Sequence, residues 1–134
     1  SRGQQLFLAP PQQNGLGCAG CHVPPSFSLE AASRSNGLDA GETRVFRSPS
    51  LETVGMGNRY MHDGRFATLE EVVEFYNSGV QPGPALDPRL ANPDGTPRRP
   101  NLSLADRAAV VAFLNTLRDS SVMTDARFMD PFRR

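Results

Sequence analysis

Two cysteines and a histidine lie close together and are the most reactive group of side chains in the sequence. Residues 18–22 read C-A-G-C-H, so Cys18 and Cys21 are three positions apart and His22 follows directly. Two thiols at this spacing can add to the two vinyl groups of one haem, and the adjacent imidazole then lies under the iron as an axial ligand. The motif therefore predicts one covalently attached haem c, with His22 as the proximal iron ligand.

Haem attachment competes with three further interpretations of this motif. A structural zinc site needs four ligands, usually Cys and His, and only His62 remains once the motif is counted. A thioredoxin-like redox pair belongs to a strand–helix setting, and the sequence shows no alternating β segments. The third interpretation is chance, because the motif is short. Haem attachment agrees best with a chain that otherwise reads as helices and loops.

Length and composition limit the classes of protein to which the chain can belong. The 134 residues suit one domain, so we expect residues 1–134 to form a single domain around one haem. The formal net charge is zero and all 14 basic residues are Arg, without a basic stripe, which argues against nucleic-acid binding. No apolar run approaches the roughly 20 residues of a membrane span. No signal peptide is recognisable at Ser1, and we expect a processed or excised segment.

Two short helices are predicted in the first half of the chain, separated by Gly- and Pro-rich loops. Residues 3–8 have Leu6 and Phe7 as apolar anchors, and two prolines follow. Residues 48–54 carry a proline where the first turn of a helix would be. Residues 23–47 show no sustained periodicity and predict a loop.

Two longer helices are predicted in the second half, each with a capping pattern. Thr68 and Glu71 form a capping box, and Gly79 lies where that helix is expected to end. Ser103 and Asp106 mark the start of the last helix in the same way. Each helix has one apolar face, made by Leu69, Val72, Val73 and Tyr76 in the first and by Val110, Phe113, Leu114 and Leu117 in the second. The sequence therefore predicts an all-α fold, with a few helices and long loops around one covalently bound haem.

A longer pattern surrounds the haem motif. Residues 46–54 read F-R-S-P-S-L-E-T-V, and residues 60–79 read Y-M-H-D-G-R-F-A-T-L-E-E-V-V-E-F-Y-N-S-G. R-G-Q-Q-L-F stands before the cysteines, and A-A-V-V-A-F-L-N-T-L stands in the last predicted helix. Together these stretches resemble the C-terminal haem domain of the di-haem cytochrome c peroxidase family, which includes MauG.

The resemblance implies a fold, a location and a role. Members of the family are periplasmic and carry two class-I-like cytochrome c domains in one chain. Their C-terminal haem is usually six-coordinate and passes electrons, whereas peroxide reacts at the other haem. This chain has a single C-x-x-C-H motif and corresponds to the electron-handling half. We therefore expect a periplasmic, class-I-like domain that exchanges electrons with a redox partner protein or a second haem domain.

The sixth iron ligand is less clearly marked than the proximal one. Residues 77–103 contain no Met, His, Cys or Lys, and Tyr76 at the end of the penultimate helix is the nearest candidate. In the family, the matching position is Met in many peroxidases and Tyr in MauG. Met61 and Met56 are alternatives, and so is a five-coordinate iron. Tyr76 could also be an ordinary core residue whose hydroxyl bonds to a neighbour.

Arginines near the recognised stretch could bind the haem propionates. Arg47 is the first choice because it matches the family's F-R pair, with Arg59 and Arg65 as alternatives. Each could instead be a solvated surface residue. His62 is followed by Asp63 and Gly64, a pattern typical of a structural turn.

Three functions remain open from the sequence. The first is an electron-transfer haem domain of a di-haem peroxidase or MauG-like protein, which relays electrons to or from a second redox centre. The second is a free-standing mono-haem electron carrier. The third is a haem peroxidase that acts at this haem, which needs a displaceable distal ligand and a nearby acid–base group. The sequence identifies no catalytic residue of that kind.

Overall fold

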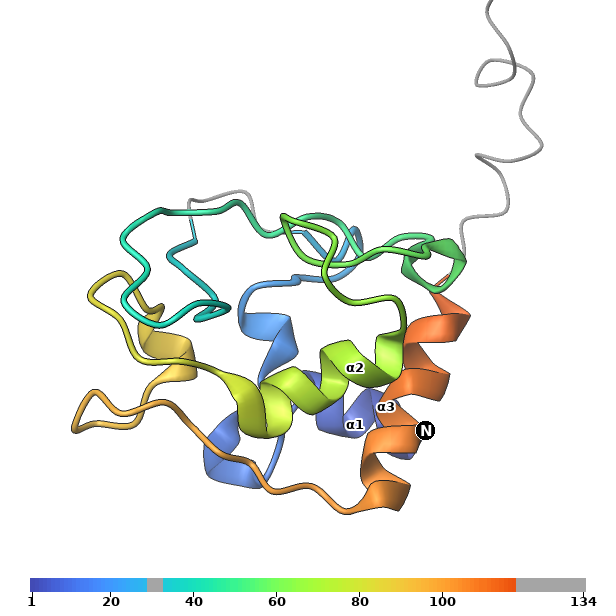
Figure 1. The fold of residues 1–134 in the computed structure, drawn as a ribbon. Coiled ribbons are helices and arrows are strands. Elements are labelled where there is room, and N and C mark those ends of the chain that lie inside the picture. Colours follow the sequence, from blue (N-terminus) through green and yellow to red (C-terminus); the bar gives the residue numbers. More distant parts are fainter. Residues whose placement is uncertain (29–32, 118–134) are drawn as a thin grey trace, which may run out of the picture.

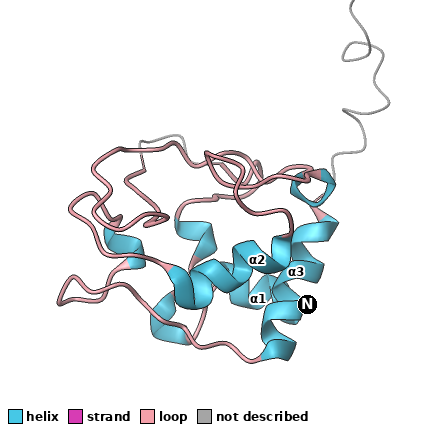
Figure 2. Cartoon of the chain, viewed as in Figure 1, coloured by secondary structure: helices cyan, strands magenta, loops and turns pink. Residues whose placement is uncertain are grey.

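In the computed structural model, which describes residues 1–28 and 33–117, three α-helices are joined by long irregular segments (Figure 1). They are α1 (Arg2–Leu8), α2 (Leu69–Glu74) and α3 (Leu104–Thr116). Single 3-10 turns form at Pro11–Gln13, Cys18–Gly20, Val54–Met56 and Pro88–Leu90. The described residues contain no β-strand, only isolated bridges between loops (Figure 2). The prediction of an all-α, loop-rich fold is confirmed.

The core is centred on the contact between α1 and α3, which lie side by side (Figure 1). Leu6 and Phe7 of α1 are buried against Val110 of α3, as the apolar faces predict. Gly3 allows the two helices to approach closely, because a Cβ atom at this position would lie 1.9 Å from the carbonyl oxygen of Ala109. The contact brings the beginning and the end of the described chain together.

Helix α2 begins with the predicted capping box. The Thr68 hydroxyl accepts a hydrogen bond from the Glu71 backbone N–H at 3.2 Å, and the Glu71 carboxylate accepts one from the Thr68 N–H at 3.0 Å. The helix then widens into a π turn over Phe75–Gly79, so it ends at the predicted glycine. Such turns are rare and occur frequently at functional sites. Here the π turn carries Tyr76.

The helix predicted over residues 48–54 is wrong. No helical turn forms before the 3-10 turn Val54–Met56. Thr53 has a φ of 66°, which a right-handed helix cannot contain, and its N–H donates to the carbonyl of Leu117 at 2.7 Å. Hydrogen bonds to distant segments therefore replace the local bonds of a helix.

Helix α3 begins at the predicted residue, because the Ser103 hydroxyl accepts a hydrogen bond from the Asp106 N–H at 3.1 Å. The Asp106 carboxylate accepts from the Arg2 guanidinium instead of completing a capping box. A second, smaller core lies beside the π turn and consists of Leu38, Phe75, Val80 and Leu86. Among the residues that the structure describes, no helix has the length and apolar character needed to cross a membrane.

Candidate haem site

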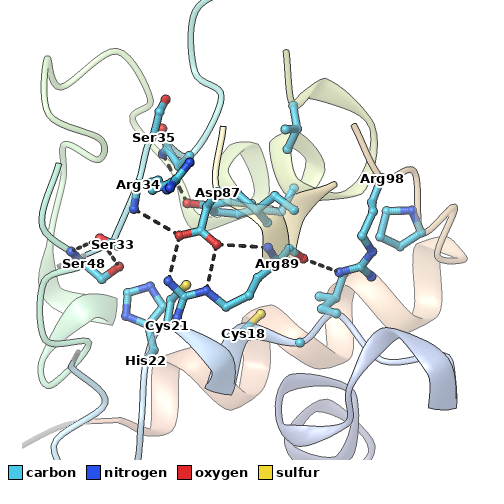
Figure 3. Close-up of a pocket in the computed structure, with 17 residues that line it drawn as sticks. Cys18, Cys21, His22, Ser33, Arg34, Ser35, Ser48, Asp87, Arg89 and Arg98 are labelled. Carbon is cyan, nitrogen blue, oxygen red and sulfur yellow. Dashed lines mark hydrogen bonds and ion pairs between the residues drawn. The ribbon is translucent and has the colours of Figure 1, made fainter. Parts of the chain in front are cut away.

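The C-A-G-C-H motif forms a tight turn in the wall of a cavity. The turn Cys18–Gly20 follows Gly17, whose φ of 70° is a left-handed conformation that favours glycine. The N–H groups of Cys21 and His22 donate to the Cys18 carbonyl at 3.1 and 2.9 Å. Burial raises the pKa of both thiols, that of Cys18 to about 12, so both stay protonated at neutral pH. The structure brings the three predicted residues of the motif together on one cavity (Figure 3).

The imidazole of His22 is held through its Nδ1 atom. Nδ1 lies 3.1 Å from the carbonyl oxygen of Phe27 and 3.0 Å from that of Pro49. Because carbonyl oxygens only accept hydrogen bonds, we assign the proton to Nδ1 and the free lone pair to Nε2. Burial also lowers the pKa of His22 and so favours the neutral ring. A neutral, oriented imidazole with a free Nε2 is suited to bind a metal.

Cys18 and His22 also line a larger cavity of about 440 Å³. Apolar side chains from all three helices and their loops form much of its wall: Phe7, Leu16, Leu51, Val54, Leu69, Val72, Val73, Val110 and Leu114. A volume of ~300–1,000 Å³ is typical of cofactor sites. Cys21 lines the smaller cavity of the cysteine turn, which shares Cys18, His22 and Tyr76 with the larger one. Together, the two adjoining cavities, two protonated thiols and a fixed imidazole fit a covalently attached haem.

Tyr76 and Met61 line the same cavity. The side-chain amide of Asn36 donates to the Tyr76 hydroxyl at 3.3 Å and to the Met61 sulfur at 3.4 Å. Within residues 1–28 and 33–117, the Tyr76 hydroxyl accepts this hydrogen bond and donates none. Burial raises the pKa of Tyr76 to about 12, because little water is available to solvate a phenolate. Met56 is 49% exposed and faces solvent instead.

The predicted propionate partners are divided between the cavity and the surface. Arg47 and Arg59 line the cavity, where both side chains remain exposed. Arg65 forms ion pairs with two aspartates. His62 also lines the cavity, and its ring stacks on that of Phe46 with centroids 4.0 Å apart.

Sequence reasoning missed Asp87 and Arg89, which border the cysteine turn (Figure 3). The Asp87 side chain is almost fully buried, and its carboxylate accepts hydrogen bonds from the Arg89 guanidinium at 2.7 and 2.8 Å and from the Arg34 N–H at 3.1 Å. The hydrogen bonds from Arg89 lower the pKa of Asp87 to about 2. Arg89 also donates to the carbonyl of Gly20 at 2.6 Å, across 69 positions of the chain. The D-P-R sequence predicts a turn at Asp87 but not this distant contact.

The chain has relatives among known proteins. No protein-family model matches the chain. It is 40% identical over 79 residues to the cytochrome-c peroxidase IdrP2 of Pseudomonas sp. (strain SCT), which covers 59% of this chain and 18% of that protein. It is 31% identical over 117 residues to the methylamine utilization protein MauG of Methylorubrum extorquens, which covers 76% of this chain and 31% of that protein. The chain therefore spans less than a third of the length of these curated relatives.

A solved structure matches over more of the chain. It is the crystal structure of a MauG-like protein associated with microbial copper homeostasis, with a TM-score of 0.72 and 28% sequence identity. The alignment covers 98% of this chain and 50% of that one. Sequence and structure thus point to the same relatives, and the chain belongs to the di-haem cytochrome c peroxidase and MauG family.

Proposed function

We propose that the chain is an electron-transfer domain with one haem c, which passes electrons to or from a second redox centre. The observation that carries the proposal is the position of His22, whose Nδ1 is held by two carbonyls beside the thiols of Cys18 and Cys21. The all-helical architecture and the likeness to a MauG-like structure support a class-I-like cytochrome c fold. The family also supports a periplasmic location and a redox partner protein or second haem domain.

Each residue of the site has a task in this proposal. The thiols of Cys18 and Cys21 would each hold the haem through one thioether, with the sulfur bonded to one carbon of a vinyl group and the thiol hydrogen on the other. His22 would bind the iron through Nε2, and the carbonyls of Phe27 and Pro49 keep its ring in place. The bound haem supplies reversible one-electron chemistry. The apolar wall of the cavity excludes water, which is one of the factors that set a haem's reduction potential.

We assign Tyr76 rather than Met61 as the distal iron ligand. Tyr76 lines the cavity, and its hydroxyl makes no donated hydrogen bond within the described part of the chain. Its place in a π turn is a second reason, because that backbone conformation is often found at functional sites. An anionic tyrosine oxygen favours ferric iron and gives a lower reduction potential than a thioether does.

Optical and electron paramagnetic resonance spectra of the ferric protein test this assignment. Tyr76→Phe removes the oxygen and keeps the ring, so we expect altered spectra and a higher reduction potential. Met61→Leu is the matched control and should leave the ferric spectra unchanged. If only Met61→Leu alters the spectra, then Met61 is the ligand and the assignment is wrong.

A second experiment separates electron transfer from peroxide chemistry. An optical redox titration of the purified protein should show one reversible one-electron transition. Hydrogen peroxide with a dye donor should give no turnover, because a six-coordinate iron offers no free position to peroxide. Turnover by this chain alone would favour a peroxidase at this haem, and the lack of a reversible transition would contradict electron transfer.

The sequence of the parent gene distinguishes a relay domain from a free-standing carrier, since only a relay domain would be preceded by a second C-x-x-C-H motif.

A further inference from the structure

We propose that Asn36 is a positioning residue that decides which side chain becomes the distal ligand. This inference rests on the proposed haem site and extends it to the choice between Tyr76 and Met61. The Nδ2 atom of Asn36 contacts the Tyr76 hydroxyl at 3.3 Å and the Met61 sulfur at 3.4 Å. The Tyr76 oxygen and the Met61 sulfur therefore lie on the same side of the cavity. The distance between them cannot exceed the sum of these two contact distances.

The backbone on both sides of Asn36 is anchored. The Ser35 carbonyl accepts a hydrogen bond from the Asp87 N–H at 2.9 Å, and the Gly37 carbonyl accepts one from the Gln81 N–H at 2.7 Å. Ser35 is also almost completely buried. The fold thus sets the position of the Asn36 amide independently of Tyr76 and Met61. A positioning residue needs this independence.

Both candidate iron ligands, Tyr76 and Met61, lie in uncommon backbone conformations. Met61 has a φ of 71°, in the left-handed region that side chains of this size rarely adopt, and Tyr76 lies in the π turn Phe75–Gly79. Conformations of this kind persist where the surrounding structure enforces them, often at functional sites. Here they direct the two candidate ligands toward one amide. The two N–H groups of that amide can donate a hydrogen bond to each of them at the same time.

Tyr76 and Met61 differ in how far their ligand atoms can move once the Asn36 amide is removed. The Tyr76 oxygen lies at the end of a rigid ring on a helical turn, so packing alone largely fixes it. The Met61 sulfur lies on a flexible side chain with three rotatable bonds, and its hydrogen bond to Asn36 restrains it. Loss of the Asn36 amide should therefore release Met61 more than Tyr76. The released sulfur then competes with the Tyr76 oxygen for the iron.

The test compares Asn36→Leu with wild-type holoprotein, because leucine has a similar volume and no N–H group to donate a hydrogen bond. Asn58→Leu is the matched control, since it makes the same exchange at an exposed position shortly before Met61. Ferric electron paramagnetic resonance spectra should show one species in wild type and in Asn58→Leu, and two species in Asn36→Leu. Adding Met61→Leu should remove the second species. Asn36→Ser, which is too short to contact both donors, provides the same comparison if Asn36→Leu does not fold.

The possible failures are distinguishable. A single ferric species in Asn36→Leu that responds to Tyr76→Phe as wild type does would overturn the role of Asn36 and leave the proposed haem site intact. Wild-type protein that binds no covalent haem would overturn the proposed site and the inference together. Spectra that do not change in Tyr76→Phe would overturn the assignment of Tyr76, and the inference with it.

Discussion

The Nδ1 atom of His22 lies 3.0 Å from the carbonyl oxygen of Pro49, which is 27 positions further along the chain. The same atom lies 3.1 Å from the carbonyl oxygen of Phe27. Two separate loops therefore hold one imidazole. Both acceptors are backbone atoms, so the orientation of the ring depends on how these loops fold and less on which side chains they carry.

The first prediction concerns His22 as proximal ligand. His22→Gln leaves both thiols in place, so we expect the protein to keep its covalent haem but to change its ferric optical spectrum, because one axial ligand is lost. Mass spectrometry and absorption spectra measure the two effects. Glu52→Gln, at an exposed position outside the cavity, is the control and should leave the spectrum unchanged. Equal spectra for His22→Gln and wild type would rule out His22 as the ligand.

The second prediction concerns the stability of the chain in acid. The pKa of Asp87 is about 2 in the folded protein, compared with its usual value of 3.8, because Arg89 stabilises the carboxylate. Between these values the unfolded chain binds the proton and the folded chain does not. The contribution of about 2 kcal/mol is therefore complete above pH 4 and is lost as the pH falls toward 2.

Urea unfolding of wild type and Asp87→Asn at several pH values checks this effect. The difference in unfolding free energy between the two proteins should be largest near neutral pH and should shrink below pH 4. Glu52→Gln, at an exposed position, is the control and should behave as wild type does. A difference that does not change with pH would show that the Asp87 carboxylate stabilises the protein by its shape alone.

The third prediction concerns the close contact between α1 and α3. A methyl group at Gly3 would meet the Ala109 carbonyl oxygen at 1.9 Å, so Gly3→Ala must push the helices apart. We expect the free energy of unfolding to fall by about 1–3 kcal/mol, which outweighs the better helix propensity of alanine. Gln4→Ala, on the exposed side of the same helix, should leave the stability nearly unchanged. A Gly3→Ala protein as stable as wild type would contradict the packing described here.

Local features of the sequence predicted the parts of the fold that depend on local physics. The caps at Thr68 and Ser103 formed as expected, because a hydroxyl three residues before a free N–H needs no distant partner. The pair Leu6 and Phe7 is buried as predicted, since helical spacing places both on the inner side of α1. The motif at residues 18–22 lies on a cavity, in agreement with its predicted chemistry.

Features that depend on distant contacts could not be read from the sequence. The pattern of residues 48–54 predicted a helix, but their hydrogen bonds join remote loops. Pro49 within this segment supplies one of the carbonyls that hold His22. Asn36 and Asp87 lie in loops without periodicity, so nothing in the sequence marked their contacts with the site. Their roles follow only from which segments the fold brings together.

The fourth prediction concerns the two thioether bonds. Cys18→Ala and Cys21→Ala should each keep the haem through the remaining sulfur, because each thiol reacts with its own vinyl group. The double variant should release the haem under denaturing conditions. Absorption spectra of the pyridine complex report the number of unreacted vinyl groups and should differ between wild type and each single variant. Identical spectra in all three proteins would contradict two separate bonds.

The most direct test of the haem site is the mass of the denatured protein, purified from cells able to attach haem to C-x-x-C-H motifs. We expect the mass of the polypeptide plus one haem, with the colour kept in the protein after extraction with acidified acetone. A polypeptide of unmodified mass, or pigment that passes into the acetone, would contradict covalent attachment at Cys18 and Cys21.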